Sequence, residues 1–309
     1  ASDVYKRQAE LQDALYVVVG LAAGATDGKI AAYLWSDGML HAAWSKHVDD
    51  HVCALTTVSG YLAAAIGHEV HTYAMEPNAL TFRRPWDCAF VSSCLASKGS
   101  TLVVGDAMHS LTVLTVAEDG SLSESARDLH PYWTSAVCVL DTEQQQYLGT
   151  DVAMNLFVAE RAKGTEPESP WSHVMRHAAA CHFGDLVNAM HTLPGGGVMY
   201  ATASGALGTL FRVPEPMACV LLCLQDAMIE AIPAPGDIPW ESWRTSRTDT
   251  RTEPPHHILD ADVLRIFVSD PSVRPPCLEK ARSLAQARDI PLAEMAEERM
   301  LHMLHALLS

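Results

Sequence analysis

The sequence predicts a mainly β protein: an incomplete seven-bladed β-propeller of about four blades or more, followed by a small C-terminal helical domain. Short β-branched and aliphatic runs bounded by Gly, Asp, Asn, Pro or Ser fill residues 101–160, a pattern typical of strands joined by tight turns. An aliphatic run, a glycine and a polar turn recur along the chain, with predicted turn centres at Gly67, Gly105, Gly149 and Gly205. Their spacing is close to the length of one propeller blade, roughly 40–50 residues.

Strand-like runs follow one another from residue 14 to residue 213, with a Pro-containing loop expected between residues 75 and 89. The interval before Gly205 also contains a polar Glu-, Pro- and Ser-rich loop at residues 161–172. The runs 61–67 and 69–75 are expected to form a hairpin across Gly67. Outside residues 101–160, the other predicted strands lie at 14–22, 29–36, 41–48, 51–58, 89–96, 183–193 and 197–213.

Helical patterns replace the strands after residue 213. Residues 216–232 place apolar side chains at helical spacing, without Gly or Pro after the first residue. Asp260 is the predicted N-cap of a helix that carries Leu264 and Phe267. Further helices are predicted at 240–248, 278–288 and 292–308.

These patterns predict three parts. Propeller blades are expected over residues 9–213 and a helical domain over residues 214–309. Residues 1–8 (ASDVYKRQ) join no pattern, so we expect them to be an appended, non-native stretch outside the fold.

The composition excludes some classes of protein. The chain has 309 residues, a formal net charge of −16 and 49% hydrophobic residues, and no apolar run reaches the roughly 18 residues of a membrane span. The acidic balance disfavours direct nucleic-acid binding, because phosphates are also negative. The eight cysteines are scattered without a C-x-x-C pair. We therefore expect buried free thiols in a reducing compartment, the nucleus or the cytoplasm.

Five segments in one order resemble a known family: VVGDAMHSLTVL, ARDLHPYWTSAVCVLD, YLGTDVAMNLFV, HFGDLVNAMH and WRTSRTDTRTEPPHHILDADVL. Together they are similar to the C-terminal region of the large subunit of the damaged-DNA-binding complex, within the cleavage and polyadenylation specificity factor A-subunit family. The phrases RDLHPYW and LGTDVAMNLFV favour this branch over the RNA-processing relatives. The resemblance implies three propellers plus a helical domain, of which this chain supplies most of the third propeller and the helical domain.

The resemblance also implies a non-enzymatic adaptor of cullin-RING ubiquitin ligases in DNA damage recognition. In the family, substrate receptors insert a helical segment between the first and third propellers, and a middle propeller, absent from this chain, holds the cullin. His109 stands where the family usually has arginine, and Val152 where it usually has asparagine. The positions that match the receptor-binding residues of the family are Phe90, Val91, Ala107, Met108, His109, Leu111, Arg127, Trp133, Leu186, Asn188, Ala189 and Ala203.

Several of these positions also allow a purely structural interpretation. A methionine and a tryptophan supply a large, adaptable apolar surface, but they also pack well inside a fold. The structural alternatives are core packing for Leu111, Leu186, Ala189 and Ala203, packing between blades for Trp133, a surface ion pair with Asp128 for Arg127, and turn capping for Asn188.

No catalytic or metal-binding motif stands out. His173, His177, Cys181 and His182 have the residue types of metal ligands, but their spacing is not that of a structural zinc site. No G-x-S-x-G, H-E-x-x-H or kinase motif occurs. We therefore expect no enzyme, no cofactor and no metal, and the alternative function is an RNA-processing scaffold of the same family that binds nucleic acid or protein.

Overall fold

The computed structural model describes residues 4–11, 14–22, 26–76, 79–161, 173–194 and 196–308. The chain divides into two compact units. The first, here the blade unit, holds the residues up to 178 together with 183–210 and 247–251. The second, here the helical unit, holds 179–182, 211–246 and 252–309. The predicted domain ranges, 9–213 and 214–309, differ from these units at residues 179–182, 211–213 and 247–251.

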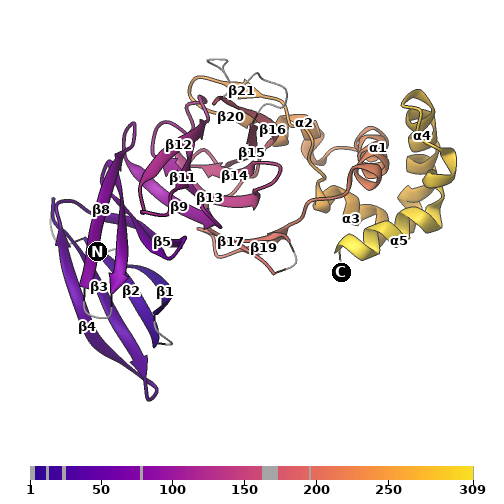
Figure 1. Cartoon of the computed structure of the whole chain (residues 1–309). Helices are drawn as coiled ribbons and strands as arrows, with labels where there is room; N and C mark the ends of the chain where they lie inside the picture. Colours follow the sequence, from indigo (N-terminus) through magenta and orange to yellow (C-terminus); the bar gives the residue numbers. More distant parts are fainter. Residues whose placement is uncertain are drawn as a thin grey trace. The chain divides into compact units, whose positions relative to one another are not determined.

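The strands up to residue 210 pair in sequence into five sheets in the described part of the chain (Figure 1). Four of these sheets have four strands and the fifth, β17–β19, has three, and each sheet is called a blade and numbered in chain order. The strands are β1 (Val4–Leu11), β2 (Ala14–Ala22), β3 (Gly28–Ser36), β4 (Met39–Val48), β5 (Val52–Val58), β6 (Tyr61–Ile66), β7 (Glu69–Glu76), β8 (Ala79–Asp87), β9 (Ser92–Lys98), β10 (Thr101–Asp106), β11 (Leu111–Val116), β12 (Leu122–Arg127), β13 (Thr134–Asp141), β14 (Gln146–Asp151), β15 (Asn155–Arg161), β16 (Met175–His182), β17 (Val187–Thr192), β18 (Val198–Thr202) and β19 (Leu207–Leu210).

The first strand of each blade contacts the first strand of the next, in the order β1, β5, β9, β13 and β17. Strand order within a blade then runs outward from this inner strand. Inner strands side by side, with later strands fanning away, are the arrangement of a β-propeller. The predicted fold class is therefore confirmed: five blades of an incomplete propeller, followed by helices.

Apolar side chains fill the space between neighbouring blades. Val18 and Ile30 of blade 1 pack with Leu62 and Tyr73 of blade 2 in one buried cluster. The opposite face of blade 2 packs against blade 3 in another cluster, which includes Leu102. Both faces of a middle blade are thus buried, which explains why its strands lack the alternation of a half-exposed sheet.

Two of the predicted turn glycines lie inside strands. Gly67 and Gly205 have positive φ angles of 55° and 91° and lie in turns, and the hairpin across Gly67 is confirmed. Gly105 and Gly149 are residues of β10 and β14, so their prediction as turn centres is wrong. A Cβ atom on Gly149 would lie 2.4 Å from Cζ of Phe157, because the tip of this ring packs against the position.

Two further expectations about the blades need correction. Residues 4–8, which were expected to lie outside the fold, belong to β1, and β1 pairs with β2 along its whole length. The expected loop between residues 75 and 89 contains β8, whose Pro85 is tolerated because β8 is the last strand of its sheet. Of the predicted polar loop, residues 162–172 lie outside the described residues.

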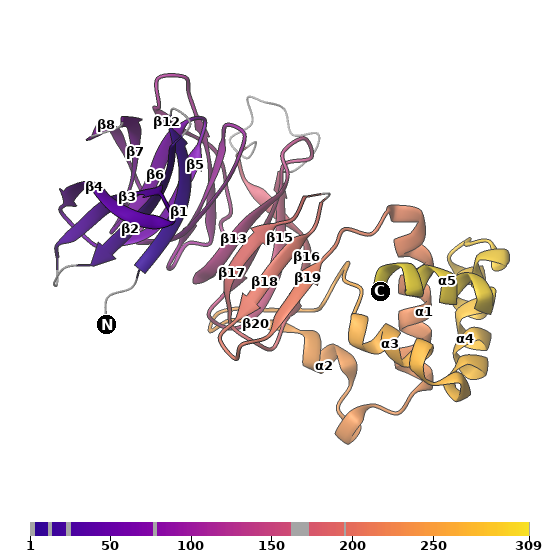
Figure 2. The ribbon, with the colours of Figure 1, turned by 90° about the horizontal axis from the view of Figure 1, so that it is seen from below.

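The helical unit is built around α1 (Glu215–Ala231), α3 (Ala261–Ser269), α4 (Arg274–Ala287) and α5 (Glu297–Leu308), which Figure 2 shows from a second direction. A short helix, α2 (Trp240–Arg244), and a two-stranded ladder of β20 (Ser246–Arg247) and β21 (Thr252–Glu253) complete the elements after residue 214, apart from three 3-10 turns. The predicted cap at Asp260 is confirmed, since its carboxylate accepts a hydrogen bond of 3.0 Å from Asp262 N. The expected helix over 292–308 is interrupted at Ala296, whose backbone is extended, so a 3-10 turn precedes α5.

Large side chains form the core of the helical unit. Leu224, Met228, Phe267 and Met300 are each fully buried there. No helix in the described ranges combines the length and the apolar character needed to span a lipid bilayer.

Candidate partner-binding surface

One backbone hydrogen bond recurs in blades 2 to 5. In each blade, the N–H group of the residue that follows the second strand donates to the carbonyl of the residue that precedes the first strand. We call this bond the end clamp. The four end clamps are Gly67 to His51 (3.0 Å), Ala107 to Val91 (2.8 Å), Val152 to Trp133 (2.9 Å) and Ala203 to Leu186 (2.8 Å).

Hydrogen bonds join the loops at the clamped end of neighbouring blades. Ser92 N donates to Gly67 O across blades 2 and 3 at 3.0 Å, and Ser110 N donates to Tyr132 O across blades 3 and 4 at 2.8 Å. Phe183 N donates to Met154 O at 2.7 Å and extends the pairing of β15 with β16 within blade 4, just before the chain enters blade 5. The loops at this end of blades 2 to 4 are therefore joined by backbone hydrogen bonds, and the chain leads from them directly into blade 5.

A β-bulge stands beside each end clamp. The second residue of each of the inner strands β5, β9, β13 and β17 has no partner in the ladder, because the pairing register shifts by one residue there. A bulge re-aims a side chain and bends its strand. The four bulge residues are Cys53, Ser93, Ser135 and Asn188.

The loops of blade 3 are fixed by one buried carboxylate. Asp106 is 4% exposed and accepts hydrogen bonds from the N–H groups of Phe90 (2.8 Å), Met108 (2.8 Å) and His109 (3.0 Å). These donors come from two different loops, so the carboxylate holds both in one arrangement. The side chains of the three donors can then project from a rigid support.

Large apolar side chains are exposed at this end of the blades. Phe90 is 49% exposed, Trp133 50% and Met108 37%, and Val152 and Met154 of the next hairpin are exposed as well. Exposed apolar residues gathered on one rigid surface are typical of protein interaction sites rather than of ordinary solvated faces.

Most of the sequence-predicted site residues lie on or beside this surface. Val91, Ala107, Trp133, Leu186 and Ala203 belong to the end clamps. Four further predicted residues lie within two positions of a clamp residue: Phe90, Met108, His109 and Asn188. The structure therefore brings together residues from three blades that lie far apart in the sequence.

Three predicted residues have other surroundings. Leu111 is fully buried in β11, which agrees with its structural alternative. The Arg127 guanidinium pairs with Glu124 rather than with Asp128, and donates to its carboxylate at 3.0 and 2.6 Å. Ala189 is an exposed residue of β17, paired with Ala201.

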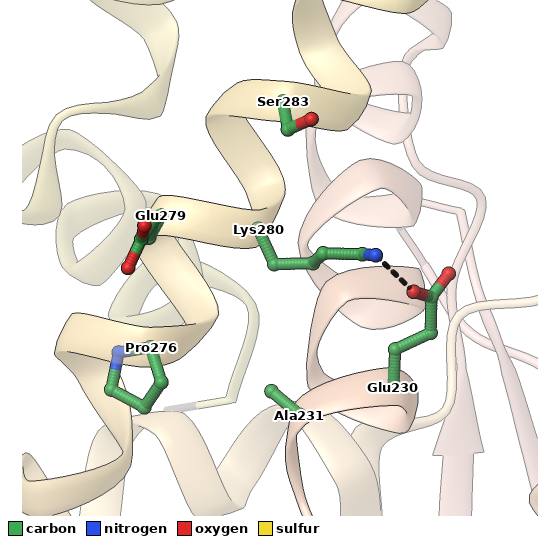
Figure 3. A pocket seen from close by; sticks show the side chains of 6 residues that line it. All are labelled: Glu230, Ala231, Pro276, Glu279, Lys280 and Ser283. Atoms are coloured by element: carbon green, nitrogen blue, oxygen red, sulfur yellow. Dashed lines mark ion pairs between the residues drawn. The ribbon is translucent and has the colours of Figure 1, made fainter.

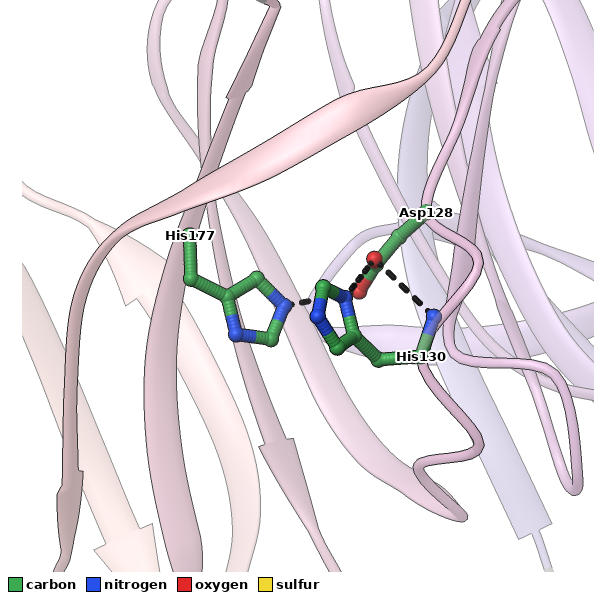
Figure 4. Close-up of side chains that lie close together, drawn as sticks. All are labelled: Asp128, His130 and His177. Atoms are coloured by element: carbon green, nitrogen blue, oxygen red, sulfur yellow. Dashed lines mark hydrogen bonds and ion pairs between the residues drawn. The ribbon is translucent and has the colours of Figure 1, made fainter. Parts of the chain in front are cut away.

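Asp128, His130 and His177 form a polar cluster, shown in Figure 4. Asp128 and His130 lie between β12 and β13, in the loop that also carries Trp133. Asp128 Oδ1 lies 2.5 Å from His130 Nδ1, and Asp128 Oδ2 lies 3.0 Å from His177 Nε2. The Ser110 hydroxyl donates to Asp128 Oδ2 at 2.6 Å. Burial by itself raises the pKa of the Asp128 carboxyl, but hydrogen bonds from His130 and His177 outweigh burial and hold this pKa well below its usual range.

Sequence reasoning missed this cluster because His177 follows Asp128 by 49 residues. Neither residue has a local motif around it. The only available signal was the polar pair Asp128 and His130 within RDLHPYW, directly after a strand.

A shallow concavity of the helical unit lies between α1 and α4 (Figure 3). Lys280 Nζ pairs there with Glu230 Oε2 at 2.5 Å. None of the sequence-predicted site residues lines this concavity, and its charged side chains are paired or solvated. The lining residues are Glu230, Ala231, Pro276, Glu279, Lys280 and Ser283.

Comparison with known proteins agrees with the fold. The model of the CPSF A subunit region matches residues 8–269. DNA damage-binding protein 1a of Arabidopsis thaliana is 28% identical over 262 residues, covering 79% of this chain and 24% of that protein. DNA damage-binding protein 1 of Solanum lycopersicum is 27% identical over 84% of this chain, and that of Oryza sativa subsp. japonica is 25% identical over 87%.

The chain spans about a quarter of the length of these curated relatives. The matched family region covers nearly all of the blades and continues into α3. With its blades, its helices and this match, the chain belongs to the CPSF A subunit family and is similar to DNA damage-binding protein 1 of plants.

Proposed function

We propose that this chain is part of a non-enzymatic adaptor whose blade-end surface docks a helical segment of substrate-receptor proteins. The blade-end surface is the surface formed by Phe90, Val91, Ala107, Met108, His109, Trp133, Leu186, Asn188 and Ala203. The adaptor would act in a cullin-RING ubiquitin ligase of DNA damage recognition, in the nucleus and the cytoplasm. Cullin would bind to a middle propeller outside this chain.

The observation that carries the proposal is the set of exposed apolar side chains on loops fixed by backbone bonds. Trp133 and Phe90 are about half exposed although they stand beside hydrogen-bonded backbone. An amphipathic helix binds by placing spaced apolar residues into such a surface. Because the loops are already held in place, docking loses little conformational entropy.

Polar side chains at the same end can orient the docked helix. Asn188 is exposed at the bulge of β17, where its amide can donate to a carbonyl and accept from an N–H group. His109 is exposed beside the Asp106 loop and offers an imidazole. The apolar residues would supply affinity and these two polar residues would fix the register of the helix.

Binding of labelled helical receptor segments to the full chain tests the proposal. The Trp133→Ala and Asn188→Ala double variant should bind at least about 30-fold more weakly, the loss of about 2 kcal/mol typical of a central tryptophan. Trp35→Ala is the matched control, since Trp35 is similarly exposed (48%) but lies in blade 1. Equal binding by the double variant and the wild type would refute the site.

A second candidate is an RNA-processing scaffold, favoured by the match to the CPSF A subunit region itself. Direct contact of this chain with RNA would require basic surface, whereas the net charge is −16. A steep decrease of RNA affinity with added salt would support this second function. Absence of RNA binding at low salt would leave only a protein-binding role in such a complex.

A further inference from the structure

We propose that Asp128, His130 and His177 form a binding site for a divalent transition metal of the zinc type. One donor atom from each of the three residues lies within 4.8 Å of the others. All three residues belong to the blade unit. The site joins the loop between β12 and β13 to β16 (Figure 4).

The donor set has the chemistry of a zinc site. Imidazole nitrogens and a carboxylate oxygen are ordinary ligands of Zn²⁺, and three protein ligands with a solvent molecule at the fourth position form a common arrangement. Two neutral imidazoles and one carboxylate also suit a divalent transition metal better than Ca²⁺ or Mg²⁺, which prefer oxygen ligands.

The distances are compatible with an ion after a small movement. Bonds of about 2.0–2.2 Å around a tetrahedral ion place neighbouring ligand atoms about 3.3 Å apart. His177 Nε2 is 3.0 Å from the Asp128 carboxylate and His130 Nδ1 is 2.5 Å from it. A shift of His130 by about 1 Å away from Asp128 would widen the shorter of these two separations to the required value, and His130 lies in a loop rather than in a strand. The rings of His130 and His177, whose centroids are 3.9 Å apart, would separate in the same movement.

The surroundings of the three ligands hold them in a binding orientation. The His177 ring stacks on the rings of Tyr132 and Phe157, at centroid distances of 5.3 and 5.0 Å. The Ser110 hydroxyl donates to Asp128 Oδ2. Such outer contacts orient the ligands of a metal and raise its affinity.

The burial of the ligands allows entry and retention of an ion. The side chain of Asp128 is fully buried and that of His177 is 2% exposed, whereas that of His130 is 19% exposed. An ion could enter beside His130 and would then be held away from bulk water. The other cluster of possible ligands in the described residues (His68, Glu69 and Asp87) is more exposed and serves as a comparison.

The competing interpretation is a hydrogen-bonded network that needs no ion. In that case Asp128 simply forms hydrogen bonds with two imidazoles and orients them. The two interpretations differ in their response to added zinc and not in their response to mutation alone, because both lose stability when a ligand is removed.

Zinc titration of the chelator-treated full chain, followed by calorimetry and elemental analysis, tests the site. The wild type should bind one equivalent of zinc. His130→Asn and His177→Gln each retain an amide that can donate to Asp128, but each should weaken zinc binding at least tenfold. The exposed-site controls His47→Gln and His68→Gln should bind zinc as the wild type does.

Unchanged zinc affinity in the His130→Asn, His177→Gln double variant would overturn the proposal, as would a wild-type chain that binds no zinc. Where a variant fails to fold, the visible spectrum of Co²⁺ bound to the wild type distinguishes between the possible ligands. Visible bands of a tetrahedral cobalt site without thiolate charge transfer support the His–His–Asp site. Thiolate charge transfer would place the ion on cysteines and refute it. Zinc binding and receptor binding are measured separately, so this inference does not rest on the proposed function.

Discussion

The blade unit and the helical unit both bury large side chains beside small ones, but the small residues lie in different surroundings. In the blades, Gly149 of β14 is covered by the Phe157 ring of the neighbouring strand β15. In the helical unit, Cys223 of α1 and Ala281 of α4 are fully buried where these two helices meet, beside large side chains such as Phe267. Added volume can therefore be tested against a single ring in the blades, and lost volume within the core shared by the helices.

The polar groups of the two units also differ. In the blades, a buried carboxylate such as Asp106 accepts hydrogen bonds from backbone N–H groups of two loops. In the helical unit, Asp260 accepts hydrogen bonds from the side chains of Arg244 (2.7 Å) and Trp240 (2.9 Å). Asp106 therefore fixes the backbone of two loops, whereas Asp260 also joins side chains of a separate helix to the start of its own helix.

The largest expected effect is a loss of volume in the helical core. Phe267 of α3 is fully buried, so Phe267→Ala should lower the free energy of unfolding of the helical unit by about 3–5 kcal/mol. Denaturant unfolding followed by helical circular dichroism measures this loss. The neighbouring variant Ile266→Ala removes a 38% exposed side chain and should cost less than about 1 kcal/mol. Equal losses for the two variants would contradict the core assignment.

Added volume in a blade should have the next largest effect. Gly149→Ala places a methyl group against the Phe157 ring and should destabilise the blade unit by about 1–3 kcal/mol. The double variant with Phe157→Leu shows whether overlap is the cause. If overlap is the cause, Phe157→Leu should lower the free energy of unfolding less in the Gly149→Ala background than in the wild type. Strictly additive losses of stability would disprove overlap as the cause.

Asp260 should make the stability of the helical unit depend on pH. Burial raises the pKa of Asp260, but hydrogen bonds from Arg244 and Trp240 outweigh burial and hold this pKa below its usual value. An aspartate with a lowered folded-state pKa stabilises the fold above its unfolded-state pKa of about 3.9. That stability should be lost as the pH falls from about 5 through the folded-state pKa.

Asp260→Asn should remove this pH dependence and cost about 2 kcal/mol at neutral pH, the usual value of a hydrogen bond to a charged group. Unfolding at several pH values measures both effects. Asp262→Asn is the control, because the side chain of Asp262 is 85% exposed. A wild-type stability that does not change between neutral pH and pH 3 would count against the assignment.

The smallest change in stability is expected at exposed tryptophans of the two units. Trp133 of the blades and Trp243 of α2 are 50% and 53% exposed. Replacing either by alanine should change the free energy of unfolding by about 0.5 kcal/mol. Only Trp133→Ala should weaken binding of a helical receptor segment. A loss of binding in both variants would point to a surface wider than the blade end.

The blade repeat could be predicted from the sequence because every blade uses β-branched runs of similar length. The role of Gly105 and Gly149 could not, because a glycine between an aliphatic run and a polar residue looks locally like a turn. The requirement for glycine comes instead from other strands, from Phe157 for Gly149 and from Cys94 and Thr134 for Gly105. Contacts between strands are not contained in a local pattern.

The blade-end residues came from resemblance, and structure was needed to sort them. Leu111 and Ala107 stand four residues apart, yet Leu111 is buried while Ala107 belongs to an end clamp. The Asp128, His130 and His177 cluster could not be predicted at all, because the approach of β16 to the loop after β12 decides it. Helix starts were easier to predict, since the Asp260 cap acts on its own neighbours.

The bulges at Cys53, Ser93, Ser135 and Asn188 give blades 2 to 5 one side chain each at the same backbone position. The Ser93 hydroxyl donates to Thr134 O of blade 4 at 2.8 Å, so this bulge fastens one blade to the next. The Ser135 hydroxyl lies 3.0 Å from Thr150 Oγ1 within blade 4. Asn188 of blade 5 is exposed instead, so the same irregularity of the backbone serves as a rivet in one blade and as an outward contact in another.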